Sequence, residues 1–197
     1  MTGFAPGDEV YGTAAAAFAD CAAARPDRIA PKPAGLTFEE AATVPVSALT
    51  SLQAVRDKGR VREGQDVLIT GAAGGVGTFA VQLAHAFGAR VTAVASTPKV
   101  DAVRTLGADH VIDYTRQDFL AAPRRYDVII DIAGNHGLRE LRRALTPRGR
   151  LVITGGETNG VWLGGTDRQL RAHCCPRSPA GTWAPSYPPS TPTGCVT

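Results

Sequence analysis

The sequence has no uninterrupted apolar run of about 18 residues, the length that a membrane-spanning helix needs. It also has no block of five or six like charges, and the formal net charge is only +3 over 197 residues. A charge this small does not indicate binding to nucleic acid or to a membrane surface. The hydrophobic fraction of 44% is ordinary for a soluble globular protein.

Cysteines and histidines lack the spacing of a metal site. Cys21 stands alone in an alanine-rich stretch, and Cys174 and Cys175 are adjacent instead of two residues apart. The histidines that could join them lie in three different predicted segments, namely His85, His110 and His136. A zinc site is therefore not predicted. Scattered, reduced cysteines suit a cytoplasmic protein.

A glycine-rich turn is the most informative feature that is present. Residues 67–77 read VLITGAAGGVG, a short aliphatic run followed by a turn with four glycines, and the segment after it has helical spacing. A strand, a glycine turn and a helix in this order predict a dinucleotide site. Gly74 takes the place where the backbone approaches a pyrophosphate, and Gly77 the place where helix and strand pack closely. Ala72 stands where the first glycine is usual.

The strand after this helix ends without a carboxylate. A site for NAD usually has Asp or Glu about 20 residues beyond the turn, to accept hydrogen bonds from the ribose 2′-hydroxyl. Here the stretch 95–99 reads ASTPK, and the next acid is Asp101. The hydroxyls of Ser96 and Thr97 and the ammonium of Lys99 suit a 2′-phosphate, so NADPH is predicted. An ordinary polar loop with a solvated lysine is the other interpretation.

Alternating β and α segments predict an α/β fold of the Rossmann type, a doubly wound parallel sheet. Residues 4–12 are expected to form a β-turn-β fragment, Thr37 and Glu40 a capping box, and residues 46–58 a separate helix that ends at Gly59. Strands are predicted at 66–70, 90–95, 110–113, 126–131 and 149–154, with helices at 75–87, 98–106 and 136–145. The doubly wound strand order is then 3-2-1-4-5, and the sixth strand is expected to be missing.

The last 25 residues differ in composition from the rest. Residues 173–197 contain no Asp, Glu, Leu, Ile or Phe, and they show neither helical nor strand periodicity. No packed element is predicted there. Two explanations stay open, a frameshifted reading frame and a natural disordered tail. The expected domains are thus residues 1–35, residues 36–172 and the tail 173–197.

The sequence resembles a known family, the medium-chain dehydrogenase/reductase superfamily, and within it the zinc-independent NADPH:quinone oxidoreductases. The resemblance is ordered and nearly continuous from about Phe4 to about Ala172. It rests on the glycine turn 71–77 and on GDEV at 7–10, PVSALT at 45–50, LGAD at 106–109, VIDY at 111–114 and YDVIID at 126–131.

The resemblance implies roles for particular positions. Those expected to contact the cofactor are Thr50, Ala73, Gly74, Gly75, Val76, Ser96, Thr97, Lys99, Tyr114, Ala133 and Gly155. In this set the turn residues hold the pyrophosphate, Ser96, Lys99 and Tyr114 surround the adenosine 2′-phosphate, and Thr50, Ala133 and Gly155 flank the nicotinamide. Residues 1–35 would be the remnant of a β-rich, GroES-like catalytic domain, so the chain is expected to be a fragment.

The resemblance implies an oxidoreductase that transfers a hydride from NADPH to a quinone or another conjugated carbonyl compound, without zinc. No catalytic residue is predicted, and a homodimer of the full-length protein is left open. Two other functions stay open: an NADPH-binding fragment without catalysis, and a zinc-free enoyl or alkene reductase or alcohol dehydrogenase-like enzyme. The chain as written is expected to be poorly stable and slow with quinones, because an unpaired fifth strand would form a sheet edge.

Overall fold

The computed structural model describes residues 3–121, 125–154 and 183–185, and the chain divides into two compact units, Met1–Leu49 and Thr50–Thr197. This division falls within a helix and lies after residue 49, whereas the sequence predicted a domain boundary after residue 35. Nearly all of the predicted tail lies outside the described residues.

The first unit contains a two-stranded antiparallel sheet. Strand β1 (Val10–Gly12) pairs with β2 (Ile29–Pro31), and the 3-10 turn η1 (Pro26–Arg28) leads into β2. The predicted β-turn-β fragment at 4–12 is therefore wrong, because β1 finds its partner in a later segment. Before β1, the amide of Ala5 donates to the Asp8 carboxylate at 2.7 Å, which makes a local turn and no second strand.

One helix replaces the two that were predicted between residues 37 and 59. Helix α1 (Phe38–Leu52) continues directly into the π-helical segment η2 (Gln53–Gly59). The predicted capping box is present: the amide of Thr37 donates to Glu40 at 2.9 Å, and the amide of Glu40 donates to the Thr37 hydroxyl at 3.2 Å. Pro45 removes one helical donor but does not end the helix. It lies buried one turn after buried Ala41, so packing outweighs the local cost.

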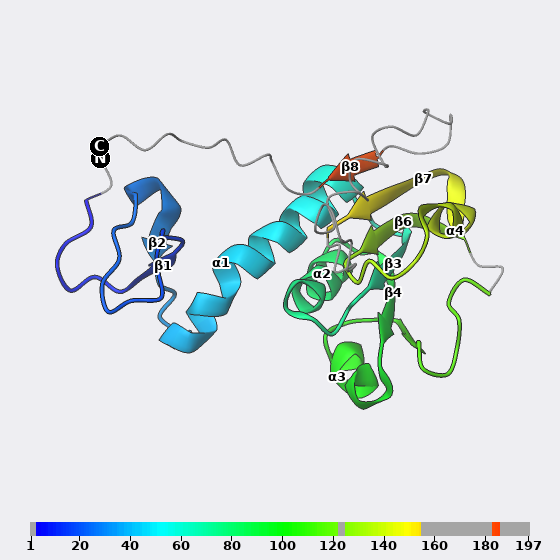
Figure 1. The fold of residues 1–197 in the computed structure, drawn as a ribbon, viewed down its shortest axis with the longest axis horizontal. Helices are drawn as coiled ribbons and strands as arrows, with labels where there is room; N and C mark the ends of the chain where they lie inside the picture. The colour runs from blue at the N-terminus through cyan, green and yellow to red at the C-terminus, as the bar shows by residue number, and fades with distance from the viewer. Residues whose placement is uncertain (1–2, 122–124, 155–182, 186–197) are drawn as a thin grey trace, which may run out of the picture. The chain divides into compact units, whose positions relative to one another are not determined.

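Within the described residues, the second unit holds a six-stranded sheet whose paired strands are all parallel (Figure 1). The strand order is β5-β4-β3-β6-β7-β8. The strands are β3 (Asp66–Thr70), β4 (Arg90–Ala95), β5 (His110–Asp113), β6 (Tyr126–Asp131), β7 (Leu145–Ile153) and β8 (Trp183–Pro185). The order of the first five strands confirms the predicted doubly wound fold. Strand β7 begins four residues before its predicted start at residue 149.

The prediction that the sixth strand is missing is wrong. Residues 183–185 pair with β7, with Trp183 opposite Leu151 and Pro185 opposite Ile153. A strand of three residues gives no periodicity that a sequence pattern can detect. It also tolerates a proline, since an edge strand needs hydrogen bonds on one side only. The edge of β7 is therefore paired over residues 151–153.

Helices cover both faces of the sheet. The predicted helices are confirmed with shorter ends, as α2 (Gly75–Ala86), α3 (Val100–Thr105) and α4 (Leu138–Arg143), and a 3-10 turn η3 (Thr97–Lys99) precedes α3. Alternate residues of β3 point into different cores: Val67 and Ile69 pack with residues of α2 and α3, while Leu68 packs with Leu141 of α4. Both faces of β3 are thus buried, as a central parallel strand requires.

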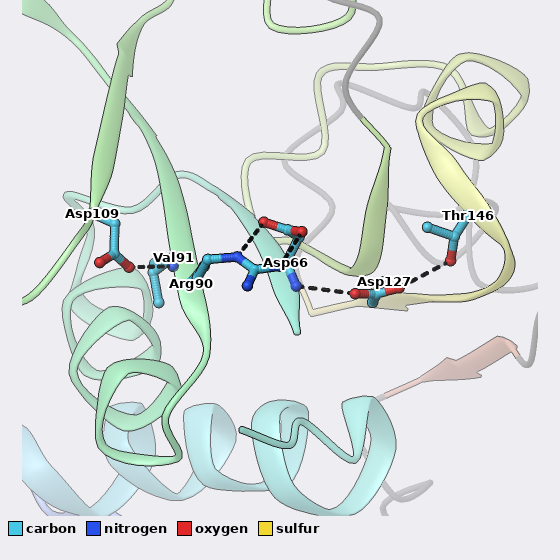
Figure 2. Close-up of polar contacts among 6 residues, drawn as sticks. All are labelled: Asp66, Arg90, Val91, Asp109, Asp127 and Thr146. Carbon is cyan, nitrogen blue, oxygen red and sulfur yellow. Dashed lines mark hydrogen bonds and ion pairs between the residues drawn. The ribbon is translucent and has the colours of Figure 1, made fainter. Parts of the chain in front are cut away.

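Polar side chains at the amino-terminal edge of the sheet bind the first amides of neighbouring strands (Figure 2). Asp127 accepts the amide of Asp66 at 3.0 Å and the hydroxyl of Thr146 at 3.2 Å, which ties β3, β6 and β7 together. Arg90 of β4 binds the Asp66 carboxylate with two hydrogen bonds, at 2.7 and 3.1 Å. Asp109 accepts the amide that follows Arg90 at 2.7 Å. These contacts fix the register of the strands.

Candidate functional site

The turn between β3 and α2 has the geometry of a phosphate-binding turn. Gly71 has φ +66°, and α2 begins after Gly74, whose backbone is extended. A Cβ on Gly77 would overlap the backbone of Gly71 and lie only 2.7 Å from the Ala72 Cα, so only glycine fits there. A Cβ on Gly74 would meet nothing nearer than the Gly71 carbonyl at 3.4 Å, on the open side of the turn. Gly77 thus allows α2 to pack closely against the turn, and Gly74 leaves space outside the turn from which a ligand could approach the backbone.

The turn is held from behind by a residue that sequence reasoning missed. The hydroxyl of Ser51, near the end of α1, donates to the carbonyl oxygen of Val76 at 2.6 Å. Ser51 is completely buried, and its neighbour Thr50 is 8% exposed. No local pattern could have assigned this contact, because the partners are 25 residues apart in the sequence.

A cleft of about 790 Å³ opens at the carboxyl ends of β3, β4, β5 and β6, entirely within the second unit. Five of the predicted cofactor residues line it: Ala73, Gly74, Ser96, Tyr114 and Ala133. The other predicted residues that the structure describes are not part of the lining. They are Thr50, Gly75, Val76, Thr97 and Lys99. Gly155 lies outside the described residues.

A buried hydroxyl–carboxylate pair joins the ends of the two central strands below the cleft. Thr70 donates to Asp131 at 2.7 Å, and its oxygen accepts the amides of Ile132 at 3.1 Å and Ala133 at 3.3 Å. Gly134 donates its amide to the same Asp131 oxygen at 3.3 Å. Both side chains are almost fully buried. This network fixes residues 132–134, which follow β6, against the end of β3.

A carboxylate does lie at the end of β4, although the sequence around β4 lacks one. Asp113 of β5 lies opposite Ala95 in the sheet, 18 residues later in the chain, and it accepts the hydroxyl of Thr97 at 2.5 Å. The amide and the hydroxyl of Thr115 donate to it at 2.9 and 2.7 Å. The hydrogen bonds from Thr97, and next those from Thr115, hold the pKa of Asp113 below its usual value. The sequence predicted no acidic side chain at the end of β4. This prediction is wrong, because the neighbouring strand β5 places Asp113 there.

Three further cleft residues escaped the sequence prediction. Arg116 lines the cleft and faces Asp113, with its Nε 3.6 Å from a carboxylate oxygen. Phe119 and His136 form an edge-to-face ring contact in the lining, with centroids 4.6 Å apart. The sequence analysis considered His136 only as a possible metal ligand and predicted no metal site. Arg116 follows predicted Tyr114 by two residues, which is the one signal that could have drawn attention to it.

The part of the chain that the structure describes contains no group of three His, Cys, Asp or Glu side chains that could hold a metal ion. These residues therefore do not provide the three or four ligands that a bound zinc ion requires. Separately, no helix among the described residues is long and apolar enough to cross a membrane.

The chain is similar in sequence to known oxidoreductases. Residues 75–168 match a family described as zinc-binding dehydrogenase. The chain is 42% identical over 160 residues to the spectinabilin polyketide synthase system protein NorB of Streptomyces orinoci, an alignment covering 79% of this chain and 7% of that protein. It is 38% identical over 144 residues to an NADPH-dependent alkenal/one oxidoreductase, chloroplastic, of Arabidopsis thaliana, covering 65% of this chain and 36% of that one.

The fold is also similar to solved structures. The quinone oxidoreductase from Coxiella burnetii superposes with a TM-score of 0.70 at 31% sequence identity, covering 90% of this chain and 55% of that one. The chain thus spans little more than half of this neighbour and smaller shares of the two curated relatives.

Proposed function

Because this chain belongs to the medium-chain dehydrogenase/reductase superfamily, we propose that it binds NADPH in the cleft and reduces a quinone or another conjugated carbonyl compound without zinc. The observation that carries the proposal is the position of the cleft. It lies at the carboxyl ends of parallel strands, where β3 passes through a glycine turn into α2 and where doubly wound folds bind dinucleotides.

The glycine turn fits a dinucleotide pyrophosphate. The first amides of α2 lack helical partners, and the helix dipole favours an anion there. Gly74 leaves space for the phosphate, and Gly75 and Val76 would present their amides to it. Ser51 would keep these amides in place through its bond to the Val76 carbonyl oxygen. A nicotinamide cofactor therefore fits the residues that are present.

The ends of β4 and β5 would hold the adenosine half. Ser96 and Tyr114 line the cleft there, and Tyr114 is 60% exposed, which leaves its ring free to cover a base. Lys99 closes the 3-10 turn that follows Ser96 and adds a positive charge to the same strand end. This combination of hydroxyls and cations suits a 2′-phosphate.

The loop after β6 would flank the nicotinamide half. Ile132 and Ala133 line the cleft, and their amides are bound by Thr70. When bound, NADPH supplies the hydride, so this chain has to provide binding and orientation. Thr70 and Asp131 would contribute by holding the loop rigid. The role of Thr50 beside the ring remains part of the proposal, although Thr50 does not line the described cleft.

A binding and turnover experiment tests this function. NADPH and NADH are titrated into the full 197-residue chain by following the reduced-nicotinamide fluorescence, and oxidation of NADPH is then followed with a simple quinone. We expect tighter binding of NADPH than of NADH, and quinone-dependent oxidation. Binding without turnover would favour the second candidate, a binding module, and failure to bind either cofactor would refute the proposal.

One comparison favours an alkene acceptor as a further candidate. The Arabidopsis relative is named for alkenals and alkenones, whose activated double bond accepts a hydride as a quinone does. Replacing the quinone by a simple α,β-unsaturated ketone in the same assay separates the two acceptors. Faster oxidation with the ketone would assign the chain to the alkene reductases, and faster oxidation with the quinone to the quinone reductases.

A further inference from the structure

The adenosine end of the cleft contains a positive charge that the superfamily motifs did not predict. We propose that Arg116 binds the 2′-phosphate of NADPH, and that Asp113 holds the guanidinium in position for it. The inference rests on the proposed use of NADPH and names the residue that selects it. It follows from three features of this strand end: the lining of the cleft, the bonds of Asp113 and the exposure of Arg116.

The lining of the cleft favours Arg116 over Lys99. Among the described residues, Arg116 is part of the lining together with Ser96 and Tyr114, whereas Thr97 and Lys99 are not. Thr97 is also occupied, since its hydroxyl donates to Asp113 and contacts the Thr115 hydroxyl at 3.0 Å. Of the three donors expected from the sequence, only Ser96 is part of the described lining, and Arg116 adds a second donor beside it.

The bonds of Asp113 limit its capacity to accept a hydrogen bond from a ribose hydroxyl. An ionised carboxylate has about four acceptor positions. One oxygen accepts both the amide and the hydroxyl of Thr115. The other accepts the Thr97 hydroxyl and faces Arg116 at 3.6 Å. The two threonines thus occupy three of the four positions, and Asp113 is itself absent from the described lining of the cleft, so this carboxylate is poorly placed to accept the 2′-hydroxyl of NADH.

Arg116 is free to exchange partners. Its side chain is 73% exposed, and its separation of 3.6 Å from Asp113 is too long for a strong hydrogen bond. A phosphate monoester carries up to two negative charges and three acceptor oxygens, and a guanidinium matches it with two parallel donors. The phosphate is thus a better partner for Arg116 than a single carboxylate that already accepts three hydrogen bonds. Asp113 keeps the side chain near the cleft until the cofactor arrives.

The experiment compares two arginines of the same local arrangement. Arg104 on α3 is 59% exposed and pairs with Asp101 three residues earlier, as Arg116 pairs with Asp113, but Arg104 is absent from the described lining of the cleft. The variants R116Q, R116K and R104Q of the full chain are titrated with NADPH and NADH. The competitors 2′,5′-ADP and 5′-AMP are titrated in parallel, because they differ only in the 2′-phosphate.

We expect R116Q to weaken NADPH and 2′,5′-ADP by roughly 10-fold or more, the loss typical of a charge-assisted contact, while NADH and 5′-AMP change less than about twofold. R116K should recover part of the loss, since it keeps the charge without the fork. R104Q should behave as the wild type. Equal losses of all four ligands with R116Q, or no loss, would overturn the inference.

The wild type separates this inference from the proposed function. If the wild type prefers NADPH and R116Q retains that preference, the proposed cofactor stands and the role of Arg116 is refuted. If the wild type binds neither cofactor, the proposed function fails and the inference fails with it. A thermal melt of each variant identifies any loss of binding that comes from unfolding.

Discussion

At the scale of single residues, one absent methyl group decides how closely α2 approaches β3. A Cβ on Gly77 would overlap backbone atoms, which cannot move without opening the turn. We expect G77A to lose about 1–3 kcal/mol or more of unfolding free energy and to lose NADPH binding with it. G74A should keep wild-type stability within about 1 kcal/mol, since its Cβ meets only an ordinary contact.

G74A should nevertheless weaken NADPH, because its methyl group would occupy the space proposed for the pyrophosphate. Urea unfolding and fluorescence titration of both variants separate the two effects. Equal stability of G77A and wild type would contradict the packing role of Gly77, and unchanged NADPH affinity of G74A would contradict its place beside the phosphate.

The Thr70 hydroxyl is a second residue with a measurable role. T70V keeps the shape of the side chain but removes the donor to Asp131 and the acceptor for two amides. We expect a loss of about 1–3 kcal/mol in the free energy of unfolding, because buried polar groups lose their partner. T70S keeps the hydroxyl and serves as the matched control. A T70V protein as stable as T70S would show that the network contributes nothing to stability.

The lowered pKa of Asp113 predicts a dependence of stability on pH. Thr97 and Thr115 stabilise its ionised form in the folded state, so its folded pKa lies below the ordinary value of 3.8. Its contribution is therefore present above about pH 4 and is lost as the pH falls through the folded pKa. We expect the stability difference between wild type and D113N to shrink from pH 6 to pH 3 in urea unfolding. A difference that grows toward acid would contradict the assignment.

At the scale of elements, side chains that bind strand amides should contribute more to the free energy of unfolding than exposed ion pairs do. Asp127 is half-buried and joins three strands, while Arg90 is 58% exposed. We expect D127A to cost about 1–3 kcal/mol of unfolding free energy. R90Q should cost less than about 1 kcal/mol despite its two short hydrogen bonds with Asp66. The reverse order of the two losses, measured in urea, would contradict this reasoning.

The elements themselves were largely predictable from the sequence. Five strands and the helices between them follow from apolar periodicity, and the capping box of Thr37 and Glu40 is visible as a four-residue pattern. The errors have a common cause. Pro45 within α1, the pairing of β1 with β2 and the short strand β8 all depend on tertiary contacts that no local pattern contains.

The same limit applies to the candidate site. The glycine turn is contiguous, so its geometry could be predicted from residues 71–77. Asp113 and Arg116 reach the end of β4 only because β5 lies beside it in the sheet. Ser51 reaches the turn across 25 residues. Reasoning along the chain therefore predicted the geometry of the glycine turn, but it missed Asp113 and Arg116, which lie beside the place proposed for the 2′-phosphate.

At the scale of the whole molecule, we expect the cofactor to change the stability and the removal of metal to leave it unchanged. NADPH at about 100 times its Kd should raise the unfolding free energy of the 197-residue chain by about 2.7 kcal/mol, because it binds only the folded state. A chelator should leave the melting temperature unchanged, and elemental analysis should find far less than one zinc per chain. Stoichiometric zinc that stabilises the protein would contradict the zinc-free proposal.

The paired edge of β7 alters one expectation for the whole molecule. Poor stability was expected because the fifth strand would be left open, and residues 183–185 cover it over three positions. That reason for instability is therefore removed. A cooperative thermal melt of the full chain would agree with the six-stranded sheet.

The parallel sheet separates two kinds of residue by the length of its strands. The bonds of Asp66, Arg90 and Asp127 lie at the amino-terminal edge, and the cleft lies at the other, about 15–20 Å away at roughly 3.3 Å per residue. Substitutions that far apart usually have additive effects. For protein engineering, the two edges can thus be changed independently. The amino-terminal edge can be altered to raise thermal stability, and the edge that forms the cleft can be altered to accept a different nucleotide.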